Sequence, residues 1–243
     1  MPSLPPLAKR LGPLILLVLM FLSAGCETAP APAPDPSAAT LDRILAGQAA
    51  NAEQAGDPAG AARHYITLYR NNRNDPAVIE GLARSLRHAG DLESARALLA
   101  EAVGRLGPQS RLLVEQGKAD IGLGKAEAAV TVLRAAMAAA PEAWEPPATL
   151  AVAFDRLGRF DEAAAHYRVA LTLTPDTADI YNNYALSRAL AGRLDEAKAL
   201  LRIAVGLPDA GSRVRENLAF LESLQRRPSG RPVRVAVPPP QVR

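Results

Sequence analysis

Few side chains in this chain of 243 residues could carry covalent or acid–base chemistry. The chain holds one cysteine, Cys26, and three histidines, His64, His88 and His166. No two of the histidines have the H-x-x-x-H or H-E-x-x-H spacing of a metal site, and no nucleophile elbow, phosphate loop or dinucleotide fingerprint occurs. The sequence therefore predicts a non-enzyme with no catalytic residue, no metal site and no bound cofactor. The histidines are interpreted as partly exposed helix residues.

Cys26 ends an N-terminal targeting segment. Lys9 and Arg10 precede the uncharged apolar run "LGPLILLVLMFLSAG", and this order is that of a secretory signal. The apolar run is shorter than the roughly 20 residues that span a bilayer as a helix, so a retained transmembrane anchor is the weaker interpretation. A lone cysteine cannot form an internal disulfide, and Cys26 needs another explanation.

The stretch "LSAGC" that ends at Cys26 resembles the lipobox of bacterial lipoproteins, with its leucine one place further from the cysteine than is usual. The resemblance implies that the signal peptide, residues 1–25, is cleaved after Gly25 and that Cys26 receives a covalent lipid. Glu27 then favours the outer membrane, with the protein facing the periplasm. An ordinary secretory signal that leaves a free thiol is the alternative.

In residues 26–41, the cysteine is followed by "ETAPAPAPDPSAAT", in which proline alternates with alanine. Proline cannot continue a helix and favours extended polyproline backbone. The sequence predicts a semi-rigid linker over 26–41 that holds a domain away from a membrane surface.

The body of the chain repeats every 34 residues, as "AGDPAGA", "AGDLESA", "LGKAEAA", "LGRFDEA" and "AGRLDEA". The glycines of these stretches predict the left-handed end of a first helix. Pro141 and Pro175 predict the end of a second helix. Small residues such as Ala83, Gly117, Ala151 and Ala185 let the two helices pack closely. The repeated positions are Gly56, Gly90, Gly124, Gly158 and Gly192, then Ala95, Ala129, Ala163 and Ala197, then Pro141 and Pro175.

Acidic residues follow each of the later glycines by three positions and are expected at the start of the second helix, where they can cap free N–H groups and oppose the helix dipole. Pro146 and Pro147 are acceptable only in a first turn, so the first helix of the fourth unit should start near them. The acids are Glu93, Glu127, Asp161 and Asp195.

The period and its pattern resemble the tetratricopeptide repeat. The resemblance implies an all-α, right-handed solenoid of antiparallel helix pairs closed by a capping helix. The expected units are 42–75, 76–109, 110–143, 144–177 and 178–211, with the capping helix at 212–226. The basic, proline-rich residues 227–243 should be disordered.

The charge distribution argues against nucleic acid as a partner. The sequence pI is about 9.2, but seven of the 28 basic residues lie in residues 1–10 and 226–243, which contain no acid. That leaves 21 basic against 25 acidic residues between them, so the repeats are mildly acidic.

The concave side of such a solenoid usually binds extended or helical peptides, and repeat geometry suggests which first-helix residues line it. We expect the basic cluster from Arg84 to Lys118 to pair with acidic groups or a peptide carboxylate. It does not reproduce the carboxylate clamp of chaperone-binding relatives. The candidate groove residues are Arg84, Arg87, His88, Arg111, Lys118, Ile121, Asn182 and Leu186.

The last unit adds a narrower resemblance. The stretch "YNNYALSRALAGRLDEAKALLRIAVGLPDAGSRVRENLAFLESLQ" resembles the TadD-type lipoproteins of tight-adherence (Flp-type) pilus assembly. The resemblance implies a pilotin-like scaffold that helps to assemble or localise the secretin and secretion machinery. The partners would be the secretin or other pilus-assembly components, with membrane contact through the lipid. The alternative is a general envelope adaptor that recruits cell-wall or protein-maturation enzymes.

Replacing Cys26 with alanine tests the anchor. We expect Cys26→Ala to release or mislocalise the protein and to leave the helical stack folded, because the linker separates the two. Membrane fractionation measures the release and circular dichroism measures the fold. A Cys26→Ala protein that fractionates with membranes as the wild type does would contradict the lipid anchor.

Overall fold

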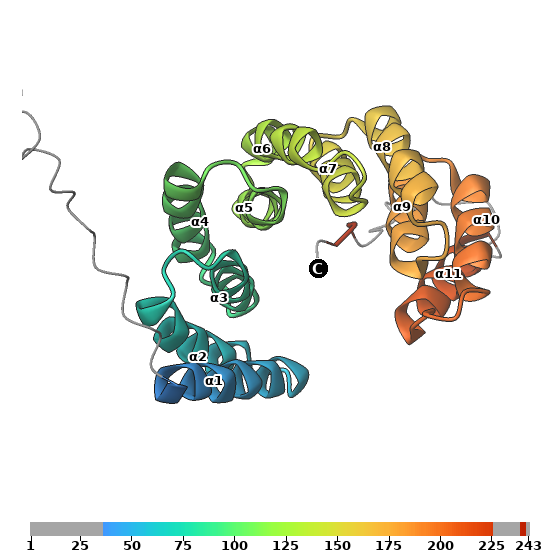
Figure 1. The fold of residues 1–243 in the computed structure, drawn as a ribbon. Coiled ribbons are helices and arrows are strands. Elements are labelled where there is room, and N and C mark those ends of the chain that lie inside the picture. Colours follow the sequence, from blue (N-terminus) through green and yellow to red (C-terminus); the bar gives the residue numbers. More distant parts are fainter. Residues whose placement is uncertain (1–35, 226–238, 242–243) are drawn as a thin grey trace, which may run out of the picture. The chain divides into compact units, whose positions relative to one another are not determined.

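The computed structural model describes residues 36–225 and 239–241 (Figure 1). The chain divides into two units, residues 1–39 and 40–243. Cys26, Gly25 and most of the expected linker lie outside the described residues. Eleven α-helices and no strand occur in the ranges that are described. None of these helices is long and apolar enough to cross a bilayer.

The helices of residues 40–225 form five successive pairs followed by one more helix. We call the first member of each pair helix A and the second helix B. In Figure 1 the A helices α3, α5 and α7 lie on the inner side of an arc, and the B helices α4, α6 and α8 lie on its outer side. The predicted all-α solenoid with a terminal helix is therefore confirmed. The A helices are α1 (Pro36–Gln54), α3 (Pro76–His88), α5 (Ser110–Gly122), α7 (Glu145–Arg156) and α9 (Ala178–Leu190); the B helices are α2 (Pro58–Asn71), α4 (Leu92–Leu106), α6 (Ala126–Ala139), α8 (Phe160–Leu173) and α10 (Leu194–Val205); α11 (Ser212–Gln225) is last.

The repeat glycines act as the sequence predicts. All five have positive φ, between 70° and 87°, a region that costs a residue with a Cβ atom. At Gly90 the turn lets the N–H of Asp91 reach back to the carbonyl of Leu86 at 2.9 Å. This bond satisfies a carbonyl that the end of α3 would otherwise leave free.

The start of each later B helix differs in detail from the prediction. The acids lie in the first turn as expected, for example Glu93 in α4. The capping carboxylate of α4, however, is Asp91, which accepts from the N–H of Ser94 at 3.2 Å. In α6, α8 and α10 the N-cap residue is Lys or Arg, with no side-chain cap. There the first-turn acids act on the helix dipole rather than as caps.

Close packing of helix A on helix B holds each pair together. Ala83, Ala151 and Ala185 are buried, and Gly117 takes their place in α5. A Cβ atom added at Gly117 would lie 2.6 Å from Cγ and Cδ2 of the fully buried Leu133 in α6. The two helices of a pair can therefore approach this closely only because these positions hold alanine or glycine.

One expectation about the ends of the solenoid is wrong. Helix α1 begins at Pro36, inside the residues predicted to be an extended linker. Proline is tolerated in the first turn of a helix, and serine, alanine and threonine follow it here. Most of the tail predicted to be disordered lies outside the described residues, and the contacts of its described segment, residues 239–241, are given below.

Helix α11 closes the stack by packing on α9 and α10. Its buried apolar residues are Val214 and Leu221, whereas Ala219, which follows Ala185 by one repeat length, is exposed. Among the described residues no B helix follows α11, so this position has no helix to approach.

Two glycine substitutions test the close approach. Gly117→Ala forces a methyl group against Leu133 and should lower the free energy of unfolding by about 1–3 kcal/mol. Gly104→Ala in α4, where a Cβ atom would meet nothing within 4 Å, should raise it by up to about 1 kcal/mol. Urea unfolding measures both. Equal effects of the two substitutions would contradict the packing account.

Candidate functional site

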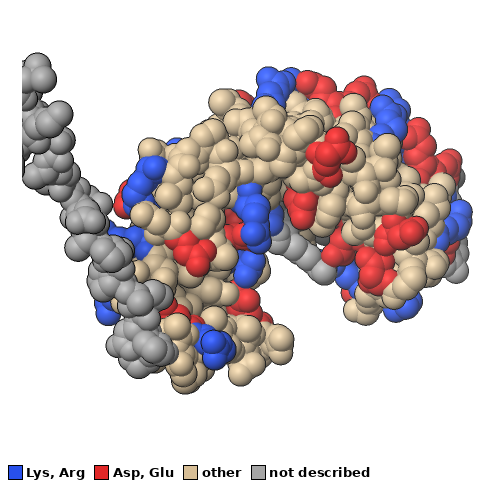
Figure 2. Space-filling model, viewed as in Figure 1, with Lys and Arg blue, Asp and Glu red and all other residues tan. Residues whose placement is uncertain are grey.

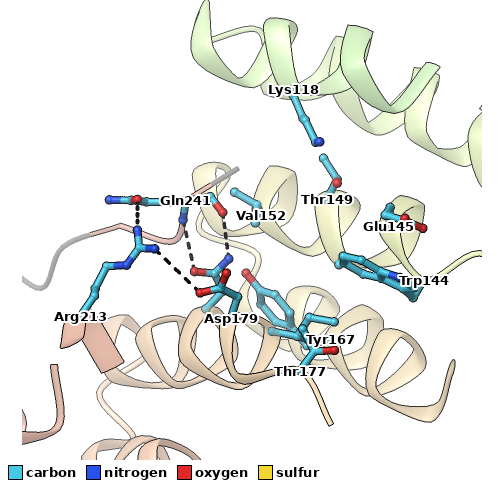
Figure 3. A pocket seen from close by; sticks show the side chains of 13 residues that line it. Lys118, Trp144, Glu145, Thr149, Val152, Tyr167, Thr177, Asp179, Arg213 and Gln241 are labelled. Atoms are coloured by element: carbon cyan, nitrogen blue, oxygen red, sulfur yellow. Dashed lines mark hydrogen bonds and ion pairs between the residues drawn. The ribbon is translucent and has the colours of Figure 1, made fainter. Parts of the chain in front are cut away.

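A pocket lies on the inner side of the solenoid, among α7, α9 and α11 (Figure 3). Its volume is about 130 Å³, and most of its lining is apolar. Trp144 stands at its α7 side and keeps 37% of its surface exposed. Such an amphipathic aromatic beside a concave apolar surface is typical of a binding site.

The start of α7 places Trp144 at the pocket. Trp144 is the N-cap residue of α7, and Pro146 and Pro147 follow within the first turn, as the sequence predicts. The start of α9 lies across the pocket and is held by the loop between α10 and α11. Both carboxylate oxygens of Asp209 accept from the N–H of Ala178 at 3.1 Å.

A buried carboxylate ties together the three helices behind the pocket. Asp155 of α7 accepts from the hydroxyl of Tyr167 in α8 at 2.9 Å and from the hydroxyl of Ser187 in α9 at 2.6 Å. Burial raises the pKa of Asp155 to about 6, although both hydrogen bonds oppose the shift. Burial, and then the charge of Asp155, raise the pKa of Tyr167 as well.

A second polar contact fixes α11 against α9. The side-chain amide of Asn217 donates to Oδ1 of Asn182 at 2.7 Å, and both residues are buried. One turn earlier on α11, Arg213 reaches Asp179 of α9, with 3.8 Å between Nη2 and Oδ1. The next residue along α9, Asn183, faces the pocket. Two adjacent asparagines therefore have different roles, one in the core and one at the surface.

Basic side chains lie along the inner edge of α3 and α5 (Figure 2), and the structure pairs them with acids of the chain. Arg84 binds Glu53 of α1 at 3.1 Å and Glu80 at 3.5 Å. Arg111 binds the other oxygen of Glu80 at 2.8 Å. These two groove candidates already have carboxylate partners, which weakens the expectation that they receive a peptide carboxylate.

The same holds deeper in the groove. Arg87 is buried and contacts Glu115 at 3.1 Å, while Lys118 contacts the other oxygen of Glu115 at 2.7 Å. Burial acts to raise the pKa of Glu115, but the charges of Lys118 and Arg87 hold it below its usual value. Lys118 also borders the pocket, and His88 is exposed at the end of α3.

Besides Arg87, three candidate groove residues that were expected at the surface are buried. Ile121, Asn182 and Leu186 are each at most 5% exposed. These side chains point toward neighbouring helices and not into the groove. The two apolar side chains are buried there, and the amide of Asn182 has a hydrogen-bond partner. Whether the remaining candidates bind a partner stays a prediction.

The residues that border the pocket from α7, α9 and α11 are not among those predicted from the sequence. Trp144 was a detectable signal, because it is the only tryptophan of the chain and lies where α7 begins. Arg213 was visible as the first residue of the terminal "RVREN" stretch. Asn183 differs from Asn182 by a single position, which corresponds to about 100° around a helix.

The histidines lie apart from one another in the described chain. His166 stacks on Phe154, with 5.3 Å between ring centroids. Burial lowers the pKa of His166, and the charge of Arg134 adds to the shift. No group of three or more His, Cys, Asp or Glu side chains that could hold a metal ion occurs within residues 36–225 and 239–241.

The raised pKa of Asp155 predicts a specific pH dependence of stability. The folded state binds more protons than the unfolded state between the ordinary pKa, 3.8, and about 6. The contribution of this group is therefore complete below that window and is lost as the pH rises through it, by about 2–3 kcal/mol in total. The free energy of unfolding of wild type minus that of Asp155→Asn should fall by this amount from about pH 4 to about pH 7.

Urea unfolding at several pH values measures this difference. Asp176→Asn, at an exposed position, is the matched control and should follow the wild-type curve. A difference between wild type and Asp155→Asn that does not change with pH would contradict the burial account of Asp155.

Known proteins with a similar sequence or structure share the tetratricopeptide-repeat fold. A tetratricopeptide-repeat model matches residues 52–116 and a TPR-repeat model matches residues 153–192. No curated protein matches the chain. The chain is similar to the crystal structure of a thermophilic TPR protein from Thermus thermophilus, with a TM-score of 0.70 and 22% identity over 75% of this chain and 99% of that one.

Two further solved structures share the fold. A tetratricopeptide-repeat protein from Parabacteroides merdae aligns with a TM-score of 0.57 and 16% identity, over 76% of this chain and 74% of that one. MamA from Desulfovibrio magneticus aligns with a TM-score of 0.51 and 18% identity, over 77% of this chain and 98% of that one. The chain is therefore a tetratricopeptide-repeat protein in fold, with the repeat recognised in residues 52–116 and 153–192.

Proposed function

We propose that this chain is a protein-interaction scaffold of the bacterial cell envelope that helps to assemble or localise the secretion machinery of a tight-adherence (Flp-type) pilus. A lipid on Cys26 tethers it to the outer membrane on the periplasmic side. The secretin or another pilus-assembly component binds its solenoid. No catalytic step is part of this function.

The pocket among α7, α9 and α11 carries the scaffold part of the proposal. Tetratricopeptide repeats generally mediate protein–protein interactions, and their concave surface is where extended peptides bind. Here that surface combines an exposed aromatic, Trp144, with side chains that can bond a peptide backbone, Asn183 and Arg213. Apolar area with a few placed polar groups is what a peptide site needs.

The envelope location and the pilus rest on the sequence. The lipobox resemblance at Cys26 supports the tether, and the terminal unit supports the pilus. Within that unit, Asn217 and Val214 of the "RVREN" stretch hold α11 on the stack, and Arg213 borders the pocket. The resemblance therefore extends to residues that shape the candidate site.

Deletion of the gene tests the function in the bacterium that encodes it. We expect loss of surface pili in electron micrographs and loss or displacement of the secretin in outer-membrane fractions. The wild-type gene and an Asn51→Ala control, which alters an exposed residue of α1, should restore both. Trp144→Ala should restore neither fully, because it removes the aromatic side of the pocket.

Unchanged piliation after deletion would contradict the pilus proposal. If cross-linking of the wild-type protein in cells then gave cell-wall hydrolases and no secretin, the general envelope adaptor would replace it. A Trp144→Ala protein that restores pili as well as the wild type would show that the partner binds elsewhere on the chain.

A further inference from the structure

The pocket already has a peptide beside it, and that peptide belongs to the same chain. Residues 239–241, Pro-Pro-Gln, lie on the inner side of the solenoid against α7, α9 and α11 (Figure 3). Pro240 is buried there, and Gln241 borders the pocket. Residues 226–238 connect this segment to α11.

The side chain of Asn183 binds the backbone of this segment, so these bonds do not depend on the segment's side chains. Its Nδ2 donates to the carbonyl of Gln241 at 2.8 Å, and its Oδ1 accepts from the N–H of Gln241 at 3.4 Å. One side-chain amide therefore satisfies both backbone groups of one residue, as a neighbouring strand would. This arrangement requires an extended backbone at the bound residue.

Two arginines bind neighbouring residues of the segment, and only Arg213 adds selectivity. Arg213 donates through Nη1 to the side-chain oxygen Oε1 of Gln241 at 2.5 Å. Arg156 donates through Nη2 to the carbonyl of Pro240 at 3.3 Å. The first contact needs a side chain with an acceptor oxygen, and the second needs only a free carbonyl.

Proline suits the position before the acceptor residue. It has no N–H to leave unpaired when it is buried, and its restricted backbone reduces the entropy lost on binding. Pro240 is buried without donating any backbone bond, so its burial leaves no unsatisfied donor. The site thus fits an extended segment in which proline precedes a residue with a side-chain oxygen.

We propose that residues 239–241 are an internal ligand of this pocket, and that a partner binds by displacing them with an extended segment of the same chemistry, a proline followed by glutamine or glutamate. This inference rests on the proposed use of the concave surface as a partner site. The covalent connection through residues 226–238 keeps the internal ligand at an effective concentration on the order of 1 mM. A partner therefore binds the full chain more weakly than it binds a chain whose tail cannot dock.

The test uses a labelled peptide with the sequence of residues 234–243, RVAVPPPQVR, titrated into the mature full-length chain in detergent. A full-length variant with Pro239→Gly, Pro240→Ser and Gln241→Ser provides the undocked state. We expect this tail variant to bind the peptide about tenfold more tightly than the wild type, because the competitor is removed. Fluorescence anisotropy gives both dissociation constants.

Point variants in the tail-variant background identify the site. Asn183→Ala should weaken peptide binding about tenfold, because two hydrogen bonds are lost, and Asn51→Ala, the control, should leave it unchanged. Arg213→Ala should weaken binding of the wild-type peptide and have little effect on a peptide with alanine in place of Gln241. This coupling is the signature of the direct Arg213–Gln241 contact.

Equal binding by the wild type and the tail variant would overturn the proposal, as would an Asn183→Ala protein that binds normally. A tail that docks in a second copy would also overturn it; sedimentation would then show a dimer that the tail substitutions dissolve. The assay contains no pilus component, so its failure is separate from a failure of the piliation experiment. Tail competition without any effect of gene deletion on pili would leave this inference standing and remove the proposed function.

Discussion

The close approach of helix A to helix B in every repeat is the constraint on which the rest of the structure depends. The approach requires a residue no larger than alanine at one position of each A helix, such as Ala83, Ala151 and Ala185. At Gly117 even a methyl group would collide with Leu133. Because each pair packs this closely, the A helices α3, α5 and α7 line the inner side of the arc. The side chains of these helices that face the hollow of the arc form the surface that a partner can reach.

Polar contacts then determine where on that surface a site can exist. Asp155 joins α7, α8 and α9 through Tyr167 and Ser187, and Asn217 joins α11 to α9 through Asn182. These buried bonds fix α7, α9 and α11 around the pocket, so that Asn183 and Arg213 face the same peptide segment. Toward the other end of the solenoid, Glu53, Glu80 and Glu115 neutralise the basic side chains of α3 and α5. Binding groups with exposed apolar area therefore gather near α7, α9 and α11.

The fold could be read from the sequence, because its strongest determinants recur. A glycine such as Gly90 has one backbone role in each repeat, and the 34-residue period repeats that role often enough to be recognised. The site could not be read in the same way, because it depends on features that do not repeat. Asn182 and Asn183 differ only in which side of α9 they occupy. The ion pairs of Arg84 and Arg111 join residues of different helices. The contact of Gln241 with Asn183 spans residues far apart in the chain, which no local pattern indicates.

Partners are proposed to bind the inner surface beside α7 and α9. Site-specific photo-cross-linking in cells tests this binding surface, with the cross-linking residue at Glu145, which is exposed and borders the pocket, or at Val169 on α8, which is 42% exposed. We expect an adduct with a pilus-assembly component at Glu145 and none at Val169. An adduct with the same partner at Val169 and none at Glu145 would show that partners bind the outer side instead.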